Sequence, residues 1–235
     1  MIINSAVIVI ILGFIFTRLM PAVGFSATVG PTIFVGSFVG TFAYIGFIRS
    51  LEETFDLKFQ RFIDYKITFP ITTSWLIISY VASYAMQLFF TSIPLLILGP
   101  LLLGSSIDFS TVHLPSFLAM YATTIIFYAL FFVSITFLTS FMWFRFNIWA
   151  RLLTPLNFFG CIWYTWHGLY SVSKPLGILV LANPYTYISE GLRTSLLHSE
   201  TSLPLSICIP IILLFSGIGL FVTVRIVYKA IDAVP

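Results

Sequence analysis

The sequence predicts an all-α integral membrane protein with six transmembrane helices, and two observations predict this class. Only 8% of the 235 residues are charged and 59% are hydrophobic, whereas a soluble domain has about a quarter of its residues charged. Six stretches have no charged residue and are long enough for a helix to cross about 30 Å of hydrocarbon: 1–17, 19–48, 67–107, 109–144, 152–173 and 201–224. The composition excludes a soluble enzyme, a disordered chain and a disulfide-stapled secreted module, and the net charge of +3 is too small for a nucleic-acid binder.

The six spans are expected over about 2–17, 33–48, 74–98, 117–142, 152–172 and 204–224. Continuous apolar runs favour helices over a β-barrel, whose strands show short alternating segments. A signal peptide is the alternative for the first span, but no basic region precedes it and no small-residue cleavage site follows it. The run 67–107 has room for two short spans, and we expect instead one long helix that bends near Pro94.

The basic residues predict the orientation of these spans. With six spans and both termini in the cytoplasm, the inner loops hold eight of the 11 Lys and Arg residues and the outer loops hold three. This asymmetry is the positive-inside pattern, and a seventh span would reverse it for the rest of the chain. The protein is therefore expected in the cytoplasmic membrane, either a bacterial inner membrane or a plasma membrane.

The densest group of charges lies between the second and third spans, where residues 49–66 hold eight of the 19 charged side chains. Ser50 and Glu53 form a capping-box pattern, which predicts a helix over about 50–66. Apolar side chains recur along one side of this helix at helical spacing: Leu51, Phe55, Phe59 and Phe62. Two interpretations stay open, an interfacial helix lying on the membrane and a docking helix for a soluble cytoplasmic partner.

A second short element lies between the fifth and sixth spans. The uncharged stretch 175–189 is too short to cross the membrane, which indicates a re-entrant or interfacial segment on the outer side. Asn183 followed by Pro184 predicts a helix start, and we expect a helix over 184–197. Glu190 and Arg193 are three residues apart and can pair on it, most simply as an interfacial ion pair that anchors the helix.

At these residues the sequence resembles a known family. The segment from Asn183 to Arg193 reads NPYTYISEGLR and resembles the N-P-x-T-Y-x-x-E-x-x-R segment ahead of the last span in permease subunits of type-2 ATP-binding-cassette (ABC) exporters. The second span, followed by Phe59-Gln60-Arg61 and then Pro70, is similar to that family's first cytoplasmic loop. Members usually carry an amphipathic cytoplasmic helix before the first span, which leaves open whether this sequence lacks that helix or is a piece of a longer chain.

The resemblance implies a permease that pairs with a second permease copy, identical or related, and docks on two cytoplasmic ABC ATPase subunits that bind ATP and Mg. It implies a coupling helix whose ATPase-docking residues are Glu52, Glu53, Phe55, Lys58, Phe59 and Arg61. It also implies an outer gate helix with the residues Asn183, Pro184, Tyr187, Glu190 and Arg193. The exported substrate would be a lipid, a glycan or a hydrophobic drug-like molecule.

The sequence itself contains no phosphate-binding pattern G-x-x-x-x-G-K-[ST], so ATP hydrolysis is expected in a separate chain. An ion-coupled secondary transporter would place carboxylates at the membrane midplane, whereas all eight Asp and Glu residues fall in expected loops or in the outer helix. The three His are scattered and the two Cys lie in expected spans, so we expect no catalytic residue, metal or cofactor in this chain. A secondary transporter and a non-transporting assembly subunit remain the alternatives.

Overall fold

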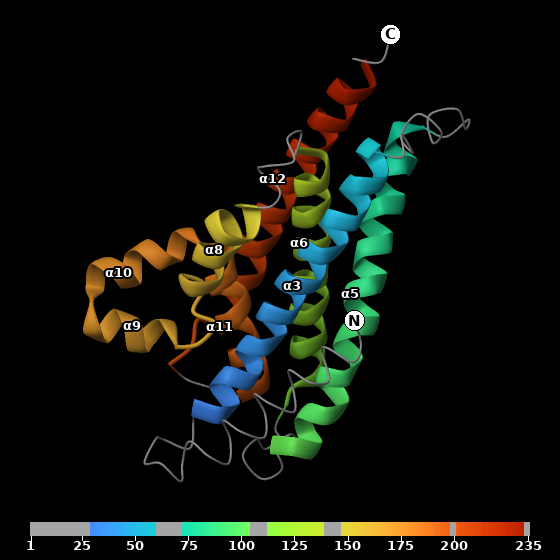
Figure 1. Cartoon of the computed structure of the whole chain (residues 1–235). Coiled ribbons are helices and arrows are strands. Elements are labelled where there is room, and N and C mark those ends of the chain that lie inside the picture. The colour runs from blue at the N-terminus through green and yellow to red at the C-terminus, as the bar shows by residue number, and fades with distance from the viewer. Residues whose placement is uncertain (1–28, 60–71, 104–111, 139–146, 198–200, 233–235) are drawn as a thin grey trace.

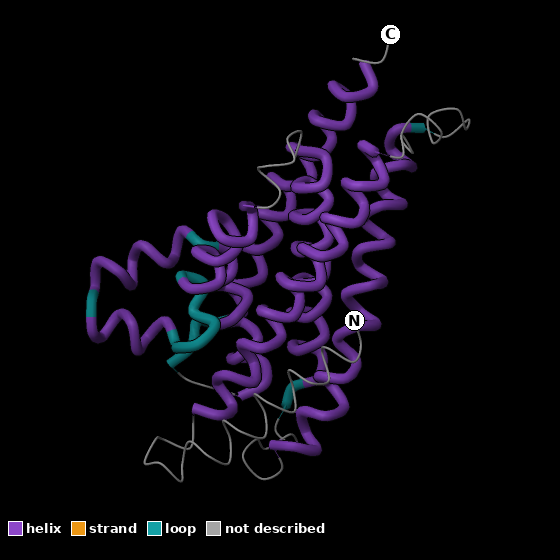
Figure 2. Tube along the Cα trace, viewed as in Figure 1, coloured by secondary structure: helices purple, strands orange, loops and turns teal. Residues whose placement is uncertain are grey.

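The computed structural model describes residues 29–59, 72–103, 112–138, 147–197 and 201–232, and within these ranges every regular element is a helix (Figure 2). The all-α class is therefore confirmed for this part of the chain. Four helices are long and apolar enough to cross a membrane: Gly30–Asp56, Ser74–Gly99, Leu114–Leu138 and Leu205–Arg225. Four such helices fit an integral membrane protein.

These four stretches belong to α3 (Val29–Phe59), α5 (Thr73–Leu103), α6 (Leu114–Leu138) and α12 (Leu205–Asp232), which run alongside one another in a bundle (Figure 1). Helix α6 packs against α3, α5 and α12. The apolar windows of α3 and α6 are each 72% buried, compared with 28% for α5 and 22% for α12. Helices α3 and α6 therefore form the core, and α5 and α12 leave most of their apolar surface on the outside.

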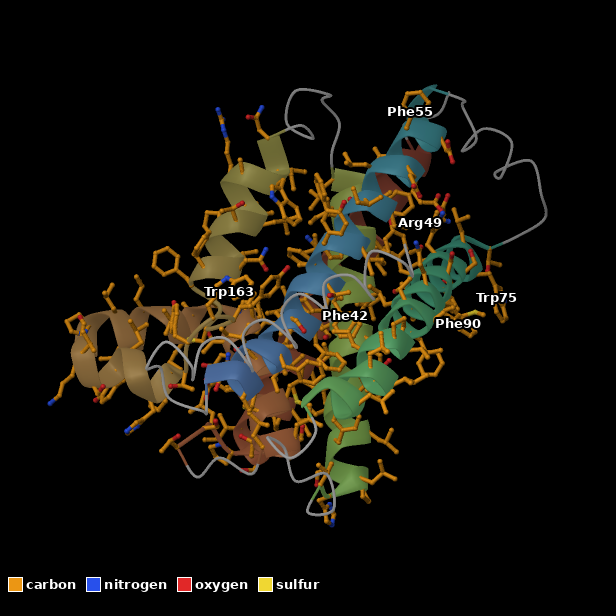
Figure 3. All side chains as sticks on the ribbon, turned by 60° about the horizontal axis from the view of Figure 1, so that its bottom comes forward. Phe42, Arg49, Phe55, Trp75, Phe90 and Trp163 are labelled. Atoms are coloured by element: carbon orange, nitrogen blue, oxygen red, sulfur yellow. The ribbon has the colours of Figure 1, made fainter. Side chains whose placement is uncertain are left out.

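Aromatic side chains and one glycine join α3 to α6. The ring of Phe42 lies 5.7 Å from the Tyr128 ring and 6.2 Å from the Tyr121 ring, and Figure 3 shows Phe42 on the part of α3 that faces the bundle. A Cβ atom at Gly46 would lie only 2.1 Å from the Phe132 ring, so this position accepts no larger side chain without a shift. On the outer side of α5, Trp75 and Phe90 are exposed and project away from the bundle (Figure 3).

The predicted helix start at Ser50 is wrong. Helix α3 continues through this residue to Phe59, and the Ser50 hydroxyl donates to the Phe47 carbonyl at 2.9 Å rather than capping a new helix. Four residues on, the buried Thr54 hydroxyl donates to the Ser50 carbonyl at 2.6 Å and also approaches the Thr136 carbonyl of α6. Packing against α6 thus continues the helix where the local pattern favours a start. The rest of the predicted coupling helix, residues 60–66, lies outside the described residues.

The predicted fifth span over 152–172 is also wrong, because the structure does not form one helix there. A π-helical turn η3 (Trp149–Leu153) leads into α8 (Thr154–Phe158), the chain reverses, and α9 (Trp166–Val172), α10 (Lys174–Leu179) and η4 (Val180–Ala182) follow. The backbone of Cys161 has a φ of 54°, the left-handed region that ends a helix. At Gly160 a Cβ atom would lie 2.6 Å from both the Leu156 carbonyl and the Tyr185 side chain, so only glycine fits.

Helices α9 and α10 form a short hairpin that projects sideways from the bundle (Figure 1). The Trp166 ring stacks on Tyr170 at 5.3 Å, and its indole N–H donates to the Gly177 carbonyl at 2.9 Å. After this hairpin, α11 (Pro184–Leu197) runs over the same residues for which the sequence predicts a short helix.

The remaining expected spans compare with the structure as follows. Helix α5 is one continuous helix through Pro94, in agreement with one long element between residues 67 and 107. Helix α6 covers 117–138 of the expected 117–142, and α12 covers the expected 204–224 from Leu205 onward. The expected first span, 2–17, lies outside the described residues.

Candidate functional site

Helix α11 begins as its sequence predicts, and its cap also ties it to α8. The Asn183 side-chain oxygen accepts a hydrogen bond from the Tyr185 backbone N–H at 3.0 Å, which satisfies one free donor of the first turn. The Asn183 side-chain nitrogen donates to the Leu156 carbonyl at 2.7 Å. Pro184 occupies the first helical position, where its missing N–H costs nothing.

Glu190 and Arg193 form the ion pair that their spacing predicts, at 2.8 Å, and both side chains are buried inside the protein. Their side chains are 0% and 1% exposed, respectively. The Glu190 carboxylate also accepts from the Trp166 backbone N–H at 2.9 Å, at the start of α9. Burial lowers the pKa of the Arg193 guanidinium, and the adjacent Glu190 carboxylate opposes that shift.

Arg193 belongs to a row of hydrogen-bond donors on one face of α11. These donors bind backbone carbonyls of the turn that follows α8. The Thr186 hydroxyl donates to the Val180 carbonyl at 2.7 Å and shares that proton with the Phe159 carbonyl at 3.2 Å. The Ser189 hydroxyl donates to the Gly160 carbonyl at 2.7 Å. The Arg193 guanidinium donates to the next two carbonyls, Cys161 at 2.6 Å and Ile162 at 2.8 Å.

Four consecutive carbonyls, 159 to 162, thus receive donors from three α11 side chains. A helix that breaks inside an apolar environment leaves carbonyls without partners, and each such group costs several kcal/mol unless the protein pairs it. We call the set Thr186, Ser189, Glu190 and Arg193 the α11 clamp.

The predicted site residues include Glu190 and Arg193 of this clamp but neither Thr186 nor Ser189. The spacing of the donors from Thr186 to Arg193, at i, i+3 and i+7, does indicate one polar face of a helix. Tyr187, selected with them, points elsewhere: its hydroxyl donates to the Leu181 carbonyl at 2.8 Å, at the corner between α10 and α11.

A groove of about 500 Å³ lies between α3 and the η3–α8 segment, and its volume is typical of small-molecule sites. Gly36 lets the two sides meet at one end, because a Cβ atom there would lie 2.0 Å from the Ile162 carbonyl oxygen. One helical turn further along, a Cβ atom at Gly40 would meet no described heavy atom within 4 Å. The lining is uncharged and rich in aromatic and hydroxyl groups: Ser37, Gly40, Thr41, Tyr44, Trp149, Thr154, Asn157, Phe158, Ile162 and Trp163.

The C-terminal end of α3 carries the predicted docking residues that the structure describes. Arg49 forms an ion pair with Glu53 and lies 3.7 Å from Glu52. The Glu53 side chain is largely buried, and the Glu52 side chain is half exposed. Phe55 is 51% exposed and lies at the far end of α3 from the groove (Figure 3). Helix α3 includes the backbone of Lys58 and Phe59, but the structure does not describe their side chains. Arg61 lies outside the described residues.

Neither a metal centre nor an activated thiol emerges from the part of the chain that the structure describes. No group of three His, Cys, Asp or Glu side chains there could hold a metal ion. Burial raises the pKa of the Cys161 thiol to about 12, and the nearby Glu190 carboxylate acts in the same direction. A thiol with such a pKa is not a nucleophile at neutral pH.

Comparison with known proteins gives no match: no protein-family model, no curated protein and no solved structure is significantly similar to this chain.

Proposed function

We propose that this chain is the membrane-spanning subunit of an ATP-driven ABC exporter. The observation that carries the proposal is the α11 clamp. The polar residues of the segment that resembles type-2 ABC permeases all bind the stretch from α8 to the first residue of α9: Asn183, Thr186, Glu190 and Arg193. A resemblance in sequence alone is weak support for a shared function. A resemblance at residues that together form one buried structure is stronger support.

The charges of the described residues argue against the ion-coupled alternative. A transporter driven by protons or sodium needs an ionisable group that can change its charge within the membrane. Here Glu190 neutralises Arg193 inside the protein, and Arg49 is paired with Glu53 near the end of α3. The fully buried carboxylate of the described residues is thus held in an ion pair, which supports an energy supply from a cytoplasmic ATPase in the proposed assembly.

In this proposal the C-terminal end of α3 faces the cytoplasm and contacts the ATPase. The Phe55 side chain is 51% exposed and the Glu52 side chain 49% exposed there, while Arg49 forms an ion pair with Glu53. Two permease copies, identical or related, and two ATPase subunits form the complex in the cytoplasmic membrane. ATP and Mg bind to the ATPase subunits, and the permease moves a lipid, a glycan or a hydrophobic drug-like substrate outward.

The proposal is tested by purifying the tagged chain from its own cells in mild detergent and identifying copurifying proteins by mass spectrometry. We expect a subunit with a phosphate-binding G-x-x-x-x-G-K-[ST] loop and ATPase activity in the purified complex. Phe55→Asp should remove that subunit while the chain stays in the membrane, because a charge replaces an apolar contact.

Val172→Asp is the matched control, because Val172 is 86% exposed on the α9–α10 hairpin, a different part of the fold. A complex that lacks a nucleotide-binding subunit would contradict the proposal. Equal recovery of the ATPase with Phe55→Asp and Val172→Asp would contradict the docking residue.

A further inference from the structure

A second, narrower groove of about 220 Å³ lies between α6, α12 and η3, and it shares no lining residue with the groove beside α3. Along α6 its lining runs from Phe127 to Leu138, which is three turns of helix or about 16 Å, so it follows the axis of the bundle. Leu138 and Leu152 line it and are 53% and 38% exposed, so this groove reaches the surface of the described structure. We call it the α6–α12 groove.

The described residues that line the α6–α12 groove offer no free hydrogen-bonding side chain. Its two polar side chains are serines, and the protein satisfies both. The Ser134 hydroxyl donates to the Leu130 carbonyl at 2.8 Å, and the Ser216 hydroxyl donates to the Ile212 carbonyl at 2.8 Å. An occupant of this groove therefore meets apolar surface, which favours a hydrocarbon chain over a polar molecule.

Two arginines lie at the end of the α6–α12 groove where α6 ends at Leu138. Helices α6 and α12 run in the same direction (Figure 1). Arg225 is three residues beyond Val222, the last residue of α12 in the lining, and therefore lies one turn further toward this end. Helix η3 follows α6 in the chain and starts at the same end, and there Arg151 directly precedes the lining residue Leu152.

Both arginines are exposed and lack a carboxylate partner among the described residues, in contrast to Arg49 and Arg193. The guanidinium of Arg225 lies 4.6 Å from the centre of the Phe221 ring, on the outer surface of α12. Long cationic side chains near the end of a membrane helix extend into the headgroup layer, where the anionic groups are phosphates. The guanidinium fork of arginine matches the geometry of a phosphate.

We propose that the α6–α12 groove and its two arginines bind one anionic phospholipid. One acyl chain lies along the apolar lining, and the phosphate contacts the guanidinium groups of Arg151 and Arg225 at the end of the groove. The buried Thr54 of α3 contacts the Thr136 carbonyl of α6, so this is also the end of the bundle at which α3 ends. The lipid comes from the surrounding bilayer, and the inference does not rest on the proposed export function.

The experiment counts lipids bound to the purified, delipidated full chain by native mass spectrometry in an uncharged detergent. Dioleoyl phosphatidylglycerol is the anionic probe, and dioleoyl phosphatidylcholine carries the same chains on a headgroup without net charge. Glycerol phosphate, added as a competitor, carries the phosphate without any chain. We expect one phosphatidylglycerol per chain, bound about tenfold more tightly than phosphatidylcholine, and no competition by glycerol phosphate at the same concentration.

Charge variants test the headgroup contact. Arg151→Gln and Arg225→Gln should each weaken phosphatidylglycerol binding by about 3- to 10-fold and leave phosphatidylcholine binding unchanged, because each removes one guanidinium from the phosphate. Arg151→Lys and Arg225→Lys keep the charge and should retain more of the preference than the glutamine variants. Lys174→Gln is the matched control, since Lys174 is exposed on α10, away from the groove.

A groove variant tests the chain contact. Val222→Phe places a ring in the groove and should weaken the binding of both lipids at least fivefold, whereas Val172→Phe, on the exposed α9–α10 hairpin, should weaken neither. Neither variant should lower the melting temperature of the lipid-free chain, because each adds volume where the structure has room.

Four results would overturn the proposal. They are equal affinities for the two lipids, a loss in Lys174→Gln as large as in the arginine variants, unchanged phosphatidylglycerol binding by Val222→Phe, and effective competition by glycerol phosphate. The second would mean that net charge alone attracts the lipid, and the last two would mean that the groove holds no chain. A lipid-free melting temperature lowered by Val222→Phe but not by Val172→Phe would show that protein fills the groove, and it too would overturn the proposal.

Discussion

Replacing Arg193 by methionine tests the α11 clamp most directly, because methionine keeps much of the volume and removes every donor. The substitution leaves the fully buried Glu190 carboxylate without its counter-charge and removes the donors to the Cys161 and Ile162 carbonyls. Removing one partner of a buried ion pair costs about 3–5 kcal/mol. Because the free energy of unfolding of native proteins is about 5–15 kcal/mol, we expect a loss of at least about a fifth of the total.

The assay is reversible unfolding of the purified chain in mixed micelles by titration with sodium dodecyl sulfate, followed by tryptophan fluorescence. Arg193→Lys is the graded comparison, since lysine keeps the charge but its single ammonium group cannot reach the carboxylate and both carbonyls in the planar fork of arginine. We therefore expect the stability order wild type, then Arg193→Lys, then Arg193→Met. A loss below about 1 kcal/mol in Arg193→Met, which is the range of surface ion pairs, would refute the clamp.

A swap of the two charges tests the Glu190–Arg193 ion pair separately from the carbonyl hydrogen bonds. Glu190→Arg combined with Arg193→Glu restores an ion pair, so we expect it to be less damaging than either single reversal. Rescue should stay partial, because an arginine at 190 cannot accept the Trp166 N–H and a glutamate at 193 cannot donate to the Cys161 and Ile162 carbonyls. Full recovery of wild-type stability in the double variant would mean that the hydrogen bonds to the carbonyls contribute nothing to stability. Purely additive losses of stability would mean that the ion pair contributes nothing.

Two further predictions concern packing and thiol chemistry. Gly46→Ala should destabilise the chain by about 1–3 kcal/mol because its Cβ atom would lie 2.1 Å from an aromatic ring on α6, whereas Gly217→Ala, which has open space, should not; equal melting temperatures would contradict this packing. A maleimide should leave Cys161 unlabelled at pH 8 in the folded chain and label it after unfolding, because its raised pKa of about 12 keeps the thiol protonated; rapid labelling of the folded chain would contradict this.

The start of α11 was predictable from the sequence because its signals are local. Asn183 and Pro184 act within one turn of the chain, and the observed hydrogen bond from the Tyr185 N–H to the Asn183 side chain needs no partner from elsewhere. The Glu190–Arg193 pair was predictable for the same reason, since three residues along a helix bring side chains together. The depth of their burial was not predictable, because it depends on the packing of α11 against α3, α6 and α12 and on the residues between α8 and α9 that bind the pair.

The fifth span and the helix start at Ser50 failed for a common physical reason. A count of uncharged residues identifies a chain that can stay in an apolar environment, but not how its backbone is satisfied there. Between Gly160 and Ile162 the carbonyls are satisfied by side chains more than twenty residues away. At Ser50 the capping pattern is present, and contacts of Thr54 with α6 keep the helix intact beyond it.

The α11 clamp and the groove lie on two sides of one short segment, residues 157–163. Residues 157 to 163 send their carbonyls from 159 to 162 toward α11, and four of their side chains, Asn157, Phe158, Ile162 and Trp163, line the groove against α3. A continuous helix could not do both, because its carbonyls would be occupied along its own axis. The reversal frees them, and α11 must then supply donors, including a buried charge with its own counter-charge. The buried ion pair is therefore part of the same structure that shapes one wall of the groove.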